Sequence, residues 1–98
     1  MFIVIWQFRV SLETATAFEK AYGAEGDWAR LFRKSPEYVK TELFRGTDSP
    51  HTYMTLDYWT SAEAFEKFQT EHRAEYLELD RGFEVLTLEE TRIGAIDG

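Results

Sequence analysis

The sequence of 98 residues contains no cysteine, and this absence excludes several kinds of chemistry. The chain has no disulfide, no thiolate nucleophile, no iron–sulfur cluster and no zinc site with cysteine ligands. Histidine is scarce as well, because His51 and His72 are the only two, which is too few to indicate a metal site. The sequence also has no Gly-rich phosphate loop and no Ser-His-Asp arrangement. It therefore predicts neither a metal nor a cofactor, and it fits a reducing compartment.

The sequence also has few positively charged residues and no long apolar run. Eleven Lys and Arg stand against eighteen Asp and Glu, which gives a formal net charge of -7. A chain of this charge repels phosphate backbones and anionic membrane surfaces. The apolar opening segment lacks a basic stretch and reaches Gln7 and Arg9 too soon for a signal peptide or a membrane span. We therefore expect a cytoplasmic protein with no nucleic-acid partner and no membrane association.

Aromatic residues, by contrast, are abundant. They make up 16% of the chain, with eight Phe, five Tyr and three Trp. Such rings are suited to a core, a subunit interface or an apolar ligand pocket, and the composition leaves all three open. The length is about that of one domain and no internal repeat is present, so we expect residues 1–98 to form a single domain.

Four segments have the alternation and the flanking turn residues that are typical of strands. They are residues 2–10, 38–45, 51–59 and 83–93, followed by a tail over 94–98. In the first segment Val4 and Phe8 lie on one side, and Ile3 and Ile5 lie on the other. The short turn between the second and third segments predicts an antiparallel hairpin.

Three segments have apolar residues at helical spacing. They are residues 13–22, residues 28–34 and a longer segment that ends near Leu79. Ser11 and Asp27 are suited to cap the first two helices. Thr60 and Glu63 match a capping box at the start of the third.

The order of these elements is β, α broken in two, β, β, α, β. With right-handed crossovers it predicts a ferredoxin-like α+β sandwich, in which helices cover one face of an antiparallel sheet. The other face then carries Ile3 and Ile5, which are too apolar to stay in water. We therefore expect a two-fold homodimer that packs this open sheet face against its copy.

The element order and the segment Tyr53–Phe65 resemble the antibiotic biosynthesis monooxygenase family. The sharpest match is Trp59-Thr60-Ser61, at the end of the third predicted strand, with support from the late Ile93-Gly94. The resemblance implies one domain of this type, the dimeric α+β barrel, and a pocket between helices and sheet. It further implies a flat aromatic substrate that reacts with oxygen without metal or flavin.

The same superfamily contains haem-degrading enzymes, which use an Asn on the first strand with a Trp and a His near the last helix. This chain departs from that pattern, because it has Trp6 and Gln7 on the first strand and Phe68 in the helix. Haem degradation is therefore not expected. Our first hypothesis is a cofactor-independent monooxygenase acting on an aromatic, polyketide-like or quinol molecule. The second is a non-catalytic dimeric module that binds a small apolar molecule.

Three titratable residues are candidates for catalysis. His72 precedes Tyr76 by one helical turn, so imidazole and phenol are placed to take a proton from a phenolic substrate and to steady the anion. Alternatively, His72 lies at the margin of the apolar stripe and bonds to a strand or to solvent. Asp57 lies in mid-strand, where burial would raise its pKa and make it a base. Alternatively, Asp57 pairs with Arg9 or Lys40 inside the barrel of the dimer, and strand parity does not settle which face it occupies.

Four aromatic residues are candidates for binding a flat ligand. Trp6, Trp59 and Phe68 are suited to form a stacking platform, although a place in the core is the more common role for any one of them. Trp28 follows a loop with two glycines, which suits a residue that covers the mouth of a pocket.

Overall fold

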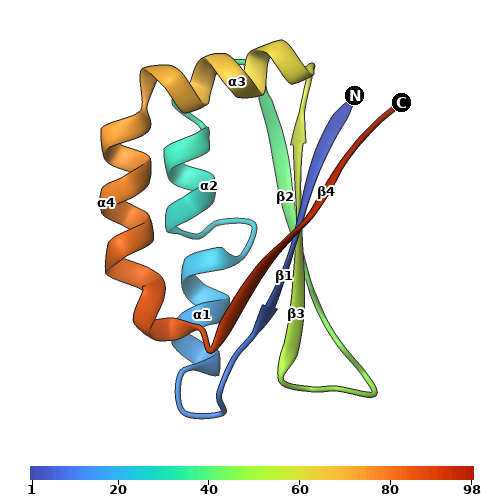
Figure 1. The fold of residues 1–98 in the computed structure, drawn as a ribbon, viewed down its shortest axis with the longest axis vertical. Coiled ribbons are helices and arrows are strands. Elements are labelled where there is room, and N and C mark those ends of the chain that lie inside the picture. The colour runs from blue at the N-terminus through green and yellow to red at the C-terminus, as the bar shows by residue number, and fades with distance from the viewer.

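The computed structural model describes residues 1–98, and its four strands form one antiparallel sheet (Figure 1). The strands are β1 (Phe2–Arg9), β2 (Tyr38–Arg45), β3 (Thr52–Trp59) and β4 (Glu89–Asp97). Their order in the sheet is β2-β3-β1-β4, so β2 and β4 are the edge strands. The predicted hairpin of β2 and β3 is confirmed, with Leu43 paired to Thr55.

The helices lie on one face of this sheet (Figure 1). They are α1 (Ala15–Tyr22), α2 (Asp27–Phe32), α3 (Ala62–Glu71) and α4 (Arg73–Phe83), followed by the 3-10 turn η1 (Glu84–Leu86). Helices α1, α2 and α4 stand beside the strands, and α3 crosses one end of the layer. The predicted ferredoxin-like α+β fold is therefore confirmed. None of the helices has the length and apolar composition that crossing a membrane requires.

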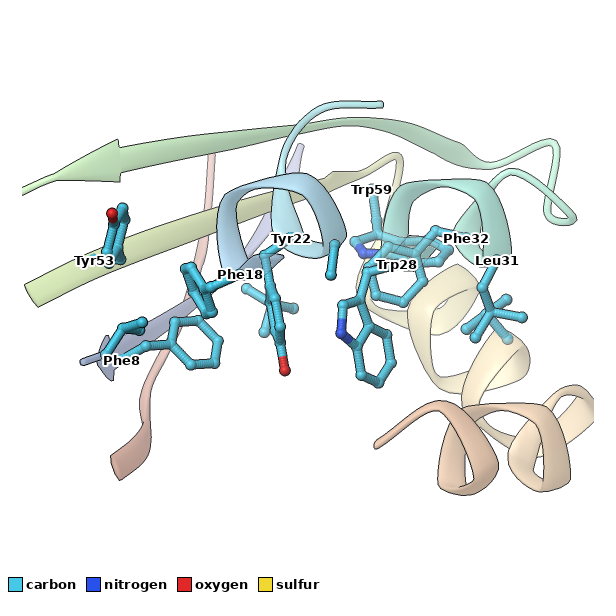
Figure 2. Close-up of a cluster of buried hydrophobic side chains, with 12 residues drawn as sticks. Phe8, Phe18, Tyr22, Trp28, Leu31, Phe32, Tyr53 and Trp59 are labelled. Carbon is cyan, nitrogen blue, oxygen red and sulfur yellow. The ribbon is translucent and has the colours of Figure 1, made fainter. Parts of the chain in front are cut away.

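The core is made largely of aromatic rings between the sheet and the helices. Side chains along β3 alternate strictly, and those of Tyr53, Thr55, Asp57 and Trp59 are buried on the helix side. Figure 2 shows a continuous layer of buried rings that runs from Phe8 to Trp59. The rings of Phe18 and Tyr22, for example, stack with centroids 4.3 Å apart. Edge-to-face and offset contacts of this kind add to the stabilisation that burial provides.

The predicted long helix is in fact two helices. The backbone of His72 leaves the helical conformation (φ -115°, ψ 26°), so His72 ends α3 and precedes α4. The direction change lets α3 cross the end of the sheet while α4 runs back along its side. The expected cap is wrong as well, because the hydroxyl of Ser61, not of Thr60, accepts the hydrogen bond from the Ala64 amide (3.1 Å).

The first two caps also differ from the prediction. Ser11 lies in a turn, and α1 begins later, after Thr14. Asp27 is the first residue of α2, and Gly26 stands at its N-cap. A Cβ on Gly26 would lie 2.4 Å from the carbonyl oxygen of Ala21, so the close approach of the backbone requires glycine there.

The fourth strand begins six residues later than predicted and includes most of the expected tail. Phe83 ends α4, and the side chains of Phe83 and Leu86 pack against the core from the helix and the η1 turn. The alternation over residues 83–88 therefore does not reflect strand structure. Gly82, the expected break, lies inside α4.

Two β-bulges interrupt the sheet. Tyr38 pairs with Trp59 and Lys40 with Tyr58, so Val39 is an extra residue in β2. In β4, Gly94 pairs with Ile5 and Arg92 pairs with Trp6, so Ile93 is the extra residue. Gly94 has a φ of +148°, a conformation that residues with a Cβ rarely adopt. Each bulge changes which side chains of its strand face the helices.

The face of the sheet away from the helices carries apolar side chains. Val4 is buried on the helix side, and Ile3 and Ile5 point the other way, as predicted. Ile5 pairs with Leu56, and Ile3 pairs with Tyr58 and Ile96. This apolar face has no helix over it in the single chain.

Candidate active site

A small cavity of about 40 Å³ lies between the sheet and helices α1, α2 and α4. Six aromatic residues, two threonines and three carboxylates line it: Trp6, Phe8, Tyr22, Trp28, Phe32, Tyr76, Thr41, Thr55, Asp57, Asp80 and Glu90. A larger cavity of about 230 Å³ adds Val4, Phe65, Gln69 and Arg92. The two cavities adjoin, because Trp6, Phe32, Asp57 and Tyr76 border both.

Asp57 lies at this junction with only 8% of its surface exposed. Its Oδ1 accepts a hydrogen bond of 2.7 Å from the Thr41 hydroxyl, and no cation contacts it. Within the single chain Arg9 pairs with Glu89 and Lys40 with Glu42, and neither contacts Asp57. Burial raises the pKa of Asp57 to about 6, although the hydrogen bond from Thr41 acts in the opposite direction. At neutral pH this carboxylate is mostly ionised and is a better proton acceptor than an ordinary aspartate.

Two tyrosines bring hydroxyl groups to the same region. Tyr76 on α4 borders both cavities, and burial, followed by the charge of Asp80, raises the pKa of its phenol. Tyr22 on α1 borders the small cavity, and burial and the charge of Glu90 raise the pKa of its phenol. Both phenols therefore stay protonated at neutral pH and are available as donors. The Tyr22 hydroxyl and the Trp28 Nε1 are buried without a hydrogen-bond partner.

His72 does not belong to this group. It borders neither cavity, its ring stacks on Phe68 with centroids 4.8 Å apart, and its Nδ1 lies 2.8 Å from Glu75 Oε1. Glu75 also pairs with Lys34, and both contacts lower the pKa of Glu75. The Tyr76 amide donates to the His72 carbonyl over 2.9 Å, as one helical turn requires, but only Tyr76 borders the cavities.

The four candidate ligand-binding residues separate into two pairs. Trp6 and Trp28 border the small cavity, and Trp6 borders the large one as well. Trp59 and Phe68 border neither and have 0% and 2% of their surface exposed, so they belong to the core. Trp28 is 7% exposed and lies within α2, where it forms a fixed wall (Figure 2). The predicted role as a cover of the pocket mouth does not fit this position.

Several residues of the cavities were not anticipated from the sequence. Glu90 pairs with Phe8, and Arg92 with Trp6, on the helix side of β4. The late start of β4 and its bulge place them there, and only the Ile93-Gly94 pair hinted at the bulge. Burial and the charge of Asp80 raise the pKa of Glu90. No group of three His, Asp or Glu side chains is arranged to hold a metal ion.

These positions define what the arrangement can do chemically. A carboxylate able to accept a proton faces a space whose walls are aromatic, and phenol donors lie beside it. A flat molecule with an acidic hydroxyl fits such walls by stacking. Deprotonation by Asp57 would create an anion that the phenol donors can stabilise.

Known proteins resemble this chain both in sequence and in structure. A model of the antibiotic biosynthesis monooxygenase family matches residues 1–79. No curated protein matches the sequence. The chain is similar in structure to a mutant form of SnoaB, which is described as a cofactor-independent oxygenase from Streptomyces nogalater. The TM-score is 0.73 at 19% sequence identity, and the match covers 99% of this chain and 91% of the other.

A second similar structure is a candidate antibiotic biosynthesis monooxygenase from Deinococcus radiodurans. Its TM-score is 0.78 at 12% identity, over 100% of this chain and 92% of the other. A third, from Bordetella bronchiseptica, has a TM-score of 0.74 at 15% identity, over 99% and 95%. At these identities the structures support the fold, and the sequence match supplies the family. The chain belongs to the antibiotic biosynthesis monooxygenase family.

Proposed function

We propose that this chain is a cofactor-independent monooxygenase that acts on a flat aromatic molecule of the polyketide or quinol type. The observation that carries the proposal is Asp57, a buried carboxylate without a cation partner at the junction of two cavities with aromatic walls. Its pKa of about 6 suits a general base, because the base should be largely ionised near neutral pH and still hold a proton well. Family membership supports the same reaction class.

The proposed reaction uses dioxygen as a co-substrate. Asp57 takes a proton from an acidic hydroxyl or C–H group of the bound substrate, and the resulting anion transfers electrons to dioxygen. Where the reacting ring carbon carries two hydrogens, one oxygen atom stays on it as a carbonyl and the other leaves with both hydrogens as water. Tyr76 donates a hydrogen bond to the anion, and Trp6 and Trp28 hold the ring plane.

Oxygen uptake in the presence of anthrone-like and quinol compounds tests this function directly. Asp57→Asn keeps the shape of the side chain and removes the base, so we expect turnover to fall by about 10² to 10⁴ fold. Asp48→Asn, in the exposed turn between β2 and β3, is the matched control and should retain full turnover. Binding of these compounds without oxygen uptake would instead favour the non-catalytic binding module.

We further propose that the protein is a cytoplasmic homodimer that pairs through the open face of the sheet. The apolar residues Ile3, Ile5 and Leu56 on that face support the proposal, because one chain has no element to cover them. A two-fold axis would bury the same patch on both copies. Sedimentation at micromolar concentration tests the assembly, and a clean monomer would contradict it.

A further inference from the structure

A chain of hydrogen bonds connects Asp57 to the edge strand β2. Thr41 Oγ1 donates to Asp57 Oδ1 over 2.7 Å. Thr41 Oγ1 also lies 2.7 Å from the hydroxyl of Tyr38. A threonine hydroxyl has a single hydrogen, so Tyr38 must be the donor in the second bond. The result is an unbroken chain of three groups in which each donor points toward the carboxylate.

The backbone of β2 is built to align this chain. Tyr38 and Thr41 are three residues apart, and in a regular strand such residues point to opposite faces of the sheet. The bulge at Val39 adds one residue, so both side chains face the helices. Bulges near active sites commonly re-aim a side chain in this way. Without the bulge the Tyr38 hydroxyl could not reach Thr41.

The hydrogen-bond chain leads from two buried residues to a partly exposed one. Asp57 and Thr41 are 8% and 4% exposed, whereas Tyr38 is partly exposed on the edge strand β2. Tyr38 borders neither cavity. Tyr38 is therefore the most exposed member of the chain, and it lies outside the space that a ligand would occupy.

The proposed reaction requires a route by which the proton on Asp57 can leave the site. A flat ligand that fills the cavities excludes water from Asp57, and the proton that Asp57 removes must leave before the next turnover. We propose that the hydroxyls of Thr41 and Tyr38 carry this proton from Asp57 to solvent at the edge of β2. The inference rests on the proposed role of Asp57 as the base.

The transfer is balanced and needs no further reactant. Protonated Asp57 gives its proton to Thr41 Oγ1, Thr41 passes its own hydrogen to Tyr38 Oη, and Tyr38 releases its hydrogen to water. Before this transfer the two hydroxyls rotate to point away from protonated Asp57, and the transfer leaves each donor pointing toward the carboxylate again, as in the structure. Burial raises the pKa of Tyr38, so its phenol stays neutral and serves as a relay.

Other titratable groups around Asp57 are less well placed for this role. Tyr76 and Asp80 approach from α4, and Glu90 and Arg92 approach from β4. The hydrogen bond from Thr41 is the one side-chain contact that Asp57 makes with a hydrogen-bonding partner. The path through β2 is therefore the continuous one.

The first test does not depend on activity. In protein with ¹³C-labelled aspartate, the Asp57 carboxyl signal is followed by NMR through the pH range around 6, where line shape and relaxation report the rate of proton exchange. We expect Thr41→Val and Tyr38→Phe each to slow this exchange by about tenfold or more, because each removes one hydroxyl of the path, and Thr41→Ser to restore it. Equal exchange rates in all four proteins would overturn the path.

The second test separates the path from the proposed function. With a substrate that supports oxygen uptake, Thr41→Val and Tyr38→Phe should lower kcat and change the solvent isotope effect with little change in KM, and Thr41→Ser should recover kcat. Loss of turnover in Asp57→Asn with normal kcat in Tyr38→Phe would refute the path and leave the function standing. Full turnover in Asp57→Asn would refute the role of Asp57 as the base, and the proton path with it, and would leave the oxygenase function standing.

Discussion

Replacing Asp57 by Asn should stabilise the fold, and the size of the effect follows from burial. The pKa of Asp57 rises from 3.8 to about 6 because the ionised carboxylate is buried without a cation. At about 1.4 kcal/mol per pH unit, this rise corresponds to about 3 kcal/mol of unfavourable free energy once the group is ionised. Asn keeps the shape and an acceptor for the Thr41 hydroxyl, and it carries no charge.

The sign of the pH dependence follows from proton linkage. Between pH 4 and 6 the folded protein holds a proton on Asp57 that the unfolded chain has lost, so the contribution of Asp57 to stability falls as pH rises through this window. Asn does not titrate. The difference in unfolding free energy between Asp57→Asn and the wild type should therefore grow from near zero at about pH 4 toward about 3 kcal/mol at about pH 7 and then level off.

Urea unfolding of both proteins at several pH values from about 4 to 8 measures this difference directly. All other titrating groups are common to the two proteins, so their contributions largely cancel. Asp48→Asn, in an exposed turn, is the control for the general effect of removing one carboxylate. A difference that stays constant across this pH range, or that favours the wild type at neutral pH, would refute the assigned environment of Asp57.

Three further predictions test separate parts of the structure. His72→Ala should leave turnover within about twofold of the wild type, because His72 borders neither cavity, and a loss near the 10² fold of a general base would contradict this. Ile5→Asp places a charge on the open face of the sheet and should shift the sedimentation of a dimer to that of a monomer, with an unchanged circular dichroism spectrum. Gly26→Ala should lower the free energy of unfolding, measured in urea, by about 1 to 3 kcal/mol, because the new Cβ would lie 2.4 Å from the Ala21 carbonyl oxygen. Gly82→Ala is the control and should not destabilise the fold, because the space around Gly82 is open.

The parts of the fold that were predictable are those set by local patterns. Strand β2 has the predicted bounds, and β3 starts one residue late, because both flank a turn rich in Gly, Asp, Ser and Pro. The break at His72 had no such signal, since neither Gly nor Pro stands there and the apolar stripe continues through it. It arises from packing, as α3 covers the end of the core and α4 its side. The local sequence pattern does not reveal how α3 and α4 pack against the core.

The candidate site was predictable to a similar extent. Asp57 stood out as a charge among apolar strand residues, and Tyr76 stood out on an apolar stripe, and both border the cavities. Glu90 and Arg92 were missed because the register of the last strand was misplaced. Tyr38 and Thr41 were missed because their spacing implies opposite faces, and the bulge that brings them together has no residue signature.

Three of the features that the sequence did not predict lie around Asp57. The bulge at Val39 turns Tyr38 and Thr41 toward Asp57, the bulge at Ile93 turns Arg92 toward Trp6, and the break at His72 redirects the chain into α4, which carries Tyr76. Regular periodicity would have placed these side chains elsewhere. Local rules tend to fail where a site requires a geometry that regular elements do not supply. The irregularities around Asp57 are thus an argument, independent of its pKa, that this part of the molecule is shaped for a ligand and not for packing alone.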